Sequence, residues 1–165
     1  MIQFEARYVN NAYHISDGKL ASTVATLYDG QWLMLNANGE YVIHDGSLHK
    51  KGFISLSSKY GDPVANINRP ITAAPAGRDN VTSSGMVSVL AGAFRLATDQ
   101  YEAGSYANGA PLKISANGKL MPCTFVAAPT TVAEVHANAI EEAKVVAYVY
   151  RAPASETDSI TIIHE

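Results

Sequence analysis

Six Asp-Gly and Asn-Gly pairs divide this chain into short segments, and they constrain its fold more than any other feature. The pairs are Asp17-Gly18, Asp29-Gly30, Asn38-Gly39, Asp45-Gly46, Asn108-Gly109 and Asn117-Gly118. Such pairs tolerate positive φ, so they suit the two-residue turns that join antiparallel strands. Strand-length runs flank two of them: Gln31–Leu35 and Tyr41–His44 lie around Asn38-Gly39, and Pro111–Ser115 and Lys119–Met121 lie around Asn117-Gly118. The spacing predicts an all-β fold, a β-barrel or β-sandwich built of hairpins.

Two of these hairpins belong to a weak internal repeat. Gly30 is followed nine residues later by Gly39, and Gly109 is followed at the same spacing by Gly118, so the two glycine pairs are offset by 79. Either one strand–turn–strand unit occurs twice, or the match is chance, because Asn-Gly is the preferred hairpin turn in any β protein. We therefore expect a single β-rich domain, 1–165, which could contain two repeat-like halves of about 1–56 and 86–165.

The segment Ser57–Gly85 would join these halves. It contains three prolines and three glycines, which disfavour strands, so we expect an irregular loop or an extended arm. A floppy linker is one interpretation, and an arm that becomes ordered on a partner is the other. Val64, Ile67 and Ile71 would give the arm apolar anchors, which favours the second interpretation. Met1–Asn11 is a second candidate arm.

The remaining segments give further expectations. Met86–Leu90 and Phe94–Leu96 are typical of strands broken at Ala91-Gly92. One short helix is expected in the C-terminal half, because Thr131 and Glu134 form a capping-box pattern. Val132, Val135, Ala139, Ile140 and Ala143 then make a helical apolar stripe. Val145–Tyr150 is expected to be a buried strand and Ser159–Ile163 a closing strand.

Charge and hydropathy exclude two classes of partner. The net charge is −3 and no basic block occurs, so we expect no nucleic-acid binding. The longest uncharged runs, Asn80–Phe94 and Leu120–Ala133, fall short of the roughly 20 residues that span a bilayer. Met1–Asn10 has no apolar core of a signal peptide. We expect no membrane partner.

A search for catalytic chemistry finds no site. The sequence contains no GxGxxG, GxxxxGK[ST] or GxSxG motif. Cys123 lies in the apolar run LMPCTFV and is expected to be a small core residue, because a reactive thiol needs an electropositive, partly open setting. We expect no enzyme activity, no catalytic residue and no cofactor.

The histidines and carboxylates lead to the same expectation. His44, Asp45 and His49 match no standard metal-ligand spacing, so we expect solvated loop histidines and no metal. His164 is expected to be frayed at the chain end. Glu141 and Glu142 are expected on a solvated helix side, and Asp99 is expected to cap a turn.

Aromatic residues leave one binding role open. Tyr28, Tyr60, Tyr101 and Tyr106 lie next to predicted turns, where exposed rings could form a sugar-binding platform. Trp32, the one tryptophan, is expected in the core because it sits in the middle of the strand-like run QWLML.

The segment Val87–Pro122 resembles the decoration, or cement, proteins of tailed-bacteriophage heads. The resemblance lies in Arg95–Tyr101, in the glycine- and leucine-containing pattern of Asn108–Leu120, in Val145–Tyr150 and in a closing strand at SITII. It implies a β-barrel or β-sandwich without catalytic residues, made in the host cytoplasm and located on the capsid exterior of the virion. It also implies two partners, the major capsid protein and further copies of the chain, as a homotrimer in preference to a dimer.

Two functions are therefore expected. The first is a structural virion protein that stabilises the expanded shell by bridging capsid subunits. The alternative is a β-rich receptor- or carbohydrate-binding module of a phage tail or fibre, and an unusual small hydrolase ranks below both. If Ser57–Gly85 is an arm, its deletion should weaken head binding and leave the fold intact.

Overall fold

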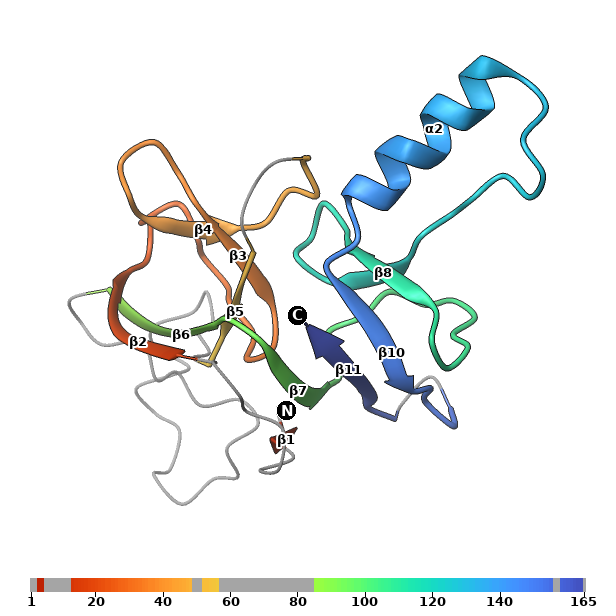
Figure 1. Ribbon diagram of the computed structural model, residues 1–165. Helices are drawn as coiled ribbons and strands as arrows, with labels where there is room; N and C mark the ends of the chain where they lie inside the picture. The colour runs from red at the N-terminus through yellow and green to blue at the C-terminus, as the bar shows by residue number, and fades with distance from the viewer. Residues whose placement is uncertain (1–2, 5–12, 49–51, 57–84, 156–157, 165) are drawn as a thin grey trace.

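The computed structural model describes residues 3–4, 13–48, 52–56, 85–155 and 158–164 (Figure 1). These residues form strands and one helix, as expected for an all-β fold with a short helix. The strands are β1 (Gln3–Phe4), β2 (Tyr13–Lys19), β3 (Trp32–Leu35), β4 (Tyr41–Ile43), β5 (Phe53–Ser55), β6 (Met86–Ala91), β7 (Phe94–Thr98), β8 (Pro111–Ile114), β9 (Leu120–Pro122), β10 (Ala147–Arg151) and β11 (Ile160–His164), and the helix is α2 (Val132–Ala143). The two candidate arms lie almost wholly outside the described residues.

The strands form two antiparallel sheets that lie beside each other in Figure 1. One has the order β2-β6-β5-β3-β4, and the other has the order β7-β11-β10-β8-β9 with the two-residue strand β1 added beside β7. Leu20, just after β2, forms an isolated parallel bridge to Tyr41 of β4, and Tyr101, just after β7, forms one to Leu120 of β9. Among the described residues no ladder pairs β2 with β4 or β7 with β9. The sheets are therefore open, so the expected all-β fold is confirmed, but of the two expected forms, barrel or sandwich, a closed barrel is not formed.

The two sheets are built on the same plan. We call β2–β6 the first unit and β7–β11 the second unit, and their five strands have the same order. The bounds of β3 and β4 move onto those of β8 and β9 by the same offset of 79. The register agrees as well, because Leu33 pairs with Ile43 as Leu112 pairs with Pro122. The repeat seen in the glycine spacing thus coincides with a repeat in the fold.

The junction of the two units differs from the sequence expectation. The first unit includes β6, and the second begins at Phe94, so the boundary lies at Gly92-Ala93 and not within 57–85. Gly92 has a φ of +85°, which suits a glycine at the break between two strands. The predicted interruption of the strand at Ala91-Gly92 is confirmed, but there the chain passes from one sheet to the other.

The sheet of the first unit is buried on both faces. Along β6, Val87 and Val89 belong to a core cluster within the first unit, whereas Leu90 belongs to a cluster that extends into the second unit. This alternation follows from the two-residue period of a strand. Trp32 and Ile54 are fully buried in the shared cluster, so the prediction that Trp32 lies in the core is confirmed.

The glycine turns differ in detail from the expected two-residue type. Gly39 and Gly118 have φ of +73° and +68°, but the asparagines before them do not have positive φ. Two-residue type I′ turns need positive φ at both positions. Backbone bonds from Asn36 to Glu40 and from Ser115 to Lys119 instead close a wider loop in both hairpins.

Asp17-Gly18 is not a turn at all. Gly18 lies inside β2, where the pairing with β6 shifts register between Ile15 and Gly18. A Cβ atom on Gly18 would lie 2.4 Å from the Tyr41 ring. The glycine therefore marks an irregularity within a strand and a close approach of an aromatic ring.

Helix α2 begins where the capping box predicted it. The Thr131 side chain accepts a hydrogen bond from the Glu134 backbone N–H, and the Glu134 carboxylate accepts one from the Thr131 N–H. None of the helix residues is buried, however, so the apolar stripe does not face a core. No helix among the described residues is long and apolar enough to span a bilayer.

Candidate interaction surfaces

The expected chemistry-bearing side chains do not converge on a site. Among the described residues, no three His, Cys, Asp or Glu side chains lie close enough together to hold a metal ion. Asp99 is exposed, and its carboxylate accepts a hydrogen bond from the Gln100 side chain. His49 lies outside the described residues.

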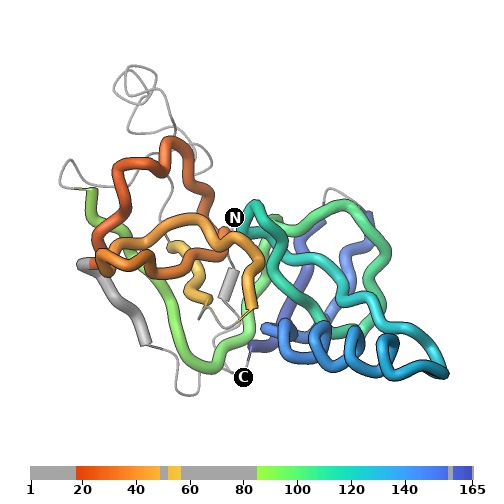
Figure 2. The backbone as a smooth tube through the Cα atoms, turned by 90° about the horizontal axis from the view of Figure 1, so that it is seen from above, coloured from red at the N-terminus to blue at the C-terminus, as the bar shows by residue number. Residues whose placement is uncertain are grey.

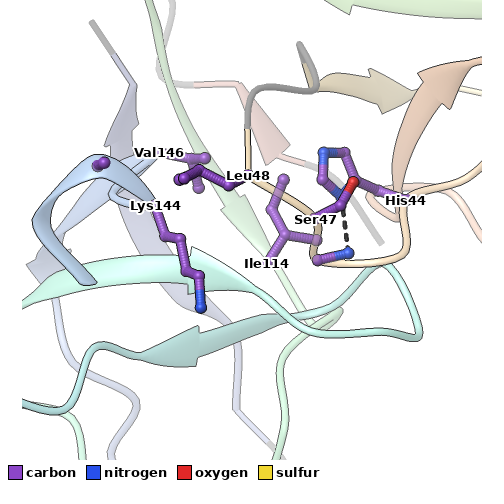
Figure 3. A pocket seen from close by; sticks show the side chains of 8 residues that line it. His44, Ser47, Leu48, Ile114, Lys144 and Val146 are labelled. Atoms are coloured by element: carbon purple, nitrogen blue, oxygen red, sulfur yellow. Dashed lines mark hydrogen bonds between the residues drawn. The ribbon is translucent and has the colours of Figure 1, made fainter. Parts of the chain in front are cut away.

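His44 contradicts the expectation of a solvated loop histidine. Its side chain is buried, and its Nδ1 accepts a 3.0 Å hydrogen bond from the backbone N–H of Gly46. It lines a small pocket with Leu48, facing Ile114 and Lys144 of the second unit (Figure 3). The pocket volume is about 40 Å³, which suits a few ordered water molecules and not a substrate. The Asp45-Gly46 turn thus closes against the second unit and buries the ring.

His164 is not frayed. It ends β11 opposite Phe94, and its ring lies edge-on to the Trp32 indole at 5.4 Å between centroids. Nδ1 of His164 also contacts the carbonyl oxygen of Val146. The side chain belongs to the contact between the two units, which sequence position alone does not reveal.

Cys123 is half-buried and lies outside both core clusters, so the expectation of a core residue is wrong. Burial raises the pKa of its thiol, and the nearby Glu141 carboxylate raises it further. A raised pKa leaves little thiolate at neutral pH. The setting does not support a nucleophilic role.

Glu141 is half-buried as well, and not on a solvated side. Its Oε2 accepts a 2.6 Å hydrogen bond from Lys113 Nζ, and its Oε1 lies 3.6 Å from Lys144 Nζ. Burial alone would raise the pKa of Glu141, but the hydrogen bonds from Lys113 and the Thr124 N–H outweigh it and lower the pKa. This ion pair attaches α2 to the outer side of β8.

The connection between β9 and β10, residues 123–146, presents an apolar surface that we call the α2 arm. Val132 and Val135 are 87% and 54% exposed, and Phe125 and Val126 are also exposed. The Asn138 side chain bonds both backbone groups of Val126, at 2.8 and 3.0 Å, and so holds the loop against the helix. The arm is ordered and follows one side of the second unit (Figure 2). Exposed apolar groups on such a projection are typical of an interaction site.

A second exposed surface lies on the outer side of the second sheet. Tyr148 is 45% exposed, and Tyr150 next to it carries the guanidinium of Arg95 at 3.4 Å from its ring centroid. The strand β10 is therefore buried on one side only, and the expectation of a wholly buried strand at Val145–Tyr150 is wrong. Tyrosine is enriched in protein interfaces, and Arg95, which is only 5% exposed, packs behind the Tyr150 ring.

No family model, curated protein or solved structure matches this chain.

The tyrosines near turns behave differently from one another. Tyr28 is exposed, whereas Tyr101 and Tyr106 are half-buried and pack edge to face at 5.3 Å; Tyr60 lies outside the described residues. Tyr101 and Tyr106 line a pocket of about 400 Å³ that also contains Asp99 and Ser155. Their hydroxyls donate to the backbone carbonyls of Asp158 and Glu102. Burial, Tyr101 and Glu102 raise the pKa of Tyr106 to about 12.

Proposed function

We propose that this chain is a structural virion protein that binds the outer surface of a phage capsid and bridges its subunits. Its partners would be the major capsid protein and further copies of itself, as a homotrimer in preference to a dimer. The observation that carries the proposal is the α2 arm, an ordered projection whose helix buries none of its residues. The resemblance of Val87–Pro122 to head decoration proteins supplies the class of partner.

The physical properties of the arm suit such a bridge. The capping box, the Asn138 bonds and the Lys113–Glu141 pair hold it in one conformation before binding. A preorganised segment loses less conformational entropy on association. Val132, Val135 and Phe125 would gain apolar burial against a capsid groove, as the anchors of an amphipathic helix do. The paired sheets behind the arm supply a rigid support.

Binding to isolated heads tests the proposal. Purified chain is mixed with expanded, empty heads that lack it, and bound chain is measured by co-sedimentation. We expect saturable binding, and the double variant Val132→Ser with Val135→Ser should weaken it at least about tenfold. Met86→Ser, at an exposed apolar position of the first unit, is the matched control and should bind as the wild type does. Failure of the wild type to bind heads, together with its absence from virions, would reject the function.

One observation favours a carbohydrate- or receptor-binding module as the second candidate. The pocket lined by Tyr101 and Tyr106 is large enough for a small sugar, and aromatic rings line it. Both hydroxyls are already bonded to backbone carbonyls, which leaves fewer polar groups for a ligand. Binding on a glycan array that Tyr101→Ala abolishes would favour this candidate, and an array without signal would disfavour it.

A further inference from the structure

The two units contact each other through dissimilar surfaces. From the first unit come Trp32, Ile54 and Leu90, which form one cross-strand row, because Trp32 pairs with Ile54 and Ile54 with Leu90. All three are buried in the shared core cluster. We call this row the first-unit face.

The surface that covers it is one end of the second unit. The ring centroid of Trp32 lies 6.3 Å from that of Phe94 and 5.4 Å from that of His164. The backbone N–H of Trp32 donates to the Gly118 carbonyl at 2.7 Å, and Gln31 Nε2 donates to the Asn117 carbonyl at 2.7 Å. Ile114, buried to 5% exposure, completes this end. The β8–β9 turn of the second unit therefore packs against the first-unit face.

The repeated fold places an equivalent of each surface elsewhere on the chain. The row that corresponds to Trp32, Ile54 and Leu90 is Pro111, Tyr148 and Ile163, because these residues pair in the same order across β8, β10 and β11. The residues that correspond to Ile114 and Gly118 are Leu35, the last residue of β3, and Gly39, in the turn that follows it. Each chain thus has a second face and a second turn.

Both equivalents are more exposed than their counterparts, although Pro111 and Ile163 in the row are half-buried. Ile54 is 0% exposed but its counterpart Tyr148 is 45% exposed, and Ile114 is 5% exposed but its counterpart Leu35 is 39% exposed. A Cβ atom on Gly118 would lie 2.5 Å from the Trp32 carbonyl oxygen, whereas one on Gly39 would have no neighbour within 4 Å. Within one chain, the turn of the second unit packs on the face of the first unit. The equivalent turn of the first unit and the equivalent face of the second unit therefore have no such partner in the described part of the chain.

We propose that a second copy of this chain occupies the open face. The β3–β4 turn of one copy, with Leu35 and Gly39, packs on the Pro111, Tyr148 and Ile163 row of the next, head to tail. The occupant is argued from the contact already present between the units. Such a heterologous contact builds a ring when its rotation closes. A ring of three copies would contain six units joined in succession. The inference does not depend on capsid binding.

Charge substitutions at the two open halves test the contact. Sedimentation velocity of the wild type at up to about 100 µM should show a concentration-dependent oligomer. Tyr148→Asp and Leu35→Asp should each weaken association at least about tenfold, because either places a charge in an apolar contact. Far-ultraviolet circular dichroism checks that both variants keep the fold. Val132→Ser, on the α2 arm, should leave the oligomer unchanged, which separates self-association from head binding.

Mixing the two variants gives the decisive result. The intact turn of the Tyr148→Asp chain can still dock on the intact face of the Leu35→Asp chain, so the mixture should form a 1:1 dimer while each variant alone stays monomeric. A mixture that remains monomeric would overturn the head-to-tail contact. So would a monomeric wild type, or an oligomer that neither substitution weakens.

Discussion

The backbone N–H of Trp32 donates a 2.7 Å hydrogen bond to the carbonyl oxygen of Gly118, and so ties a strand of the first unit to a turn of the second. Gly118 and Gly39 occupy the same place in two hairpins of the same register. The Gly118 turn packs against the first unit, whereas the Gly39 turn has no neighbouring unit among the described residues. The pair of glycines therefore offers a comparison in which the local turn is constant and only the surroundings differ.

Gly118→Ala should destabilise the protein more than Gly39→Ala. Both substitutions place alanine at positive φ, which costs roughly 1–2 kcal/mol. Only the Gly118 Cβ meets a backbone atom, the Trp32 carbonyl oxygen, and overpacking of this kind adds about 1–3 kcal/mol. Urea unfolding followed by circular dichroism gives both free energies of unfolding. Equal losses for the two variants would show that Gly118 is required by its turn alone.

The hairpins and the helix could be predicted because their signals are local. Asn38-Gly39 and Asn117-Gly118 each need a glycine at positive φ, and the Thr131–Glu134 capping box needs only four residues. Both kinds of signal act within one turn of chain, so a sequence displays them. The offset of 79 can be read from the sequence because each of the two hairpins carries this local glycine signal.

Long-range contacts could not be predicted in this way. Gly18 looks like a turn residue until the Tyr41 ring is placed beside it, and His44 looks solvated until the second unit covers its loop. The apolar residues of β6 and of α2 look alike in the sequence, yet those of β6 join core clusters on both faces of its sheet, whereas α2 has no fully buried residue. The candidate surfaces depend on which units pack together, and one sequence does not specify that packing.

Trp32→Phe should be tolerated far better than Trp32→Ala. The indole Nε1 is buried without a hydrogen-bond partner among the described residues, so phenylalanine removes an unsatisfied donor and keeps a ring beside Phe94 and His164. Alanine would leave a cavity between the units and cost about 3–5 kcal/mol. Thermal unfolding by calorimetry measures the two losses. If both variants lost equal stability, the indole itself and not an aromatic ring would be needed there.

Lys113→Met should release the α2 arm from the second unit. It leaves the half-buried Glu141 carboxylate with the Thr124 N–H at 3.3 Å and Lys144 at 3.6 Å but without its closest partner, at a cost of about 1–3 kcal/mol. The pKa of Glu141, lowered in the wild type, should rise. The stabilisation by the pair is present above the ordinary glutamate pKa of about 4.3 and is lost as pH falls through the lower folded value. Carboxyl carbon chemical shifts from nuclear magnetic resonance follow this titration directly.

The pair of Lys19 and Glu40, in which the lysine is exposed and the glutamate is not, is the matched control for that substitution. Its nitrogen–oxygen distance is also 2.6 Å, but the Lys19 side chain is 66% exposed. Solvent screens such a pair, so Lys19→Met should leave the midpoint of thermal unfolding unchanged. A loss as large as that of Lys113→Met would mean that burial does not explain the strength of the inner pair.

Glu134 should make the start of α2 sensitive to acid. Hydrogen bonds from the Thr130 and Thr131 N–H groups, at 2.8 and 2.9 Å, lower the pKa of its carboxylate. A lowered folded pKa means that this contribution is complete above the ordinary glutamate pKa and disappears as pH falls through the folded value. Amide hydrogen exchange of Thr130 and Thr131 should therefore quicken, relative to the intrinsic rate at each pH, as pH falls through the lowered folded pKa of Glu134. Glu134→Gln keeps an acceptor oxygen without a titrating group and should remove this pH dependence, whereas Glu142→Gln on the same helix should retain it. Unchanged protection through this range in the wild type would show that the capping box does not hold the helix start.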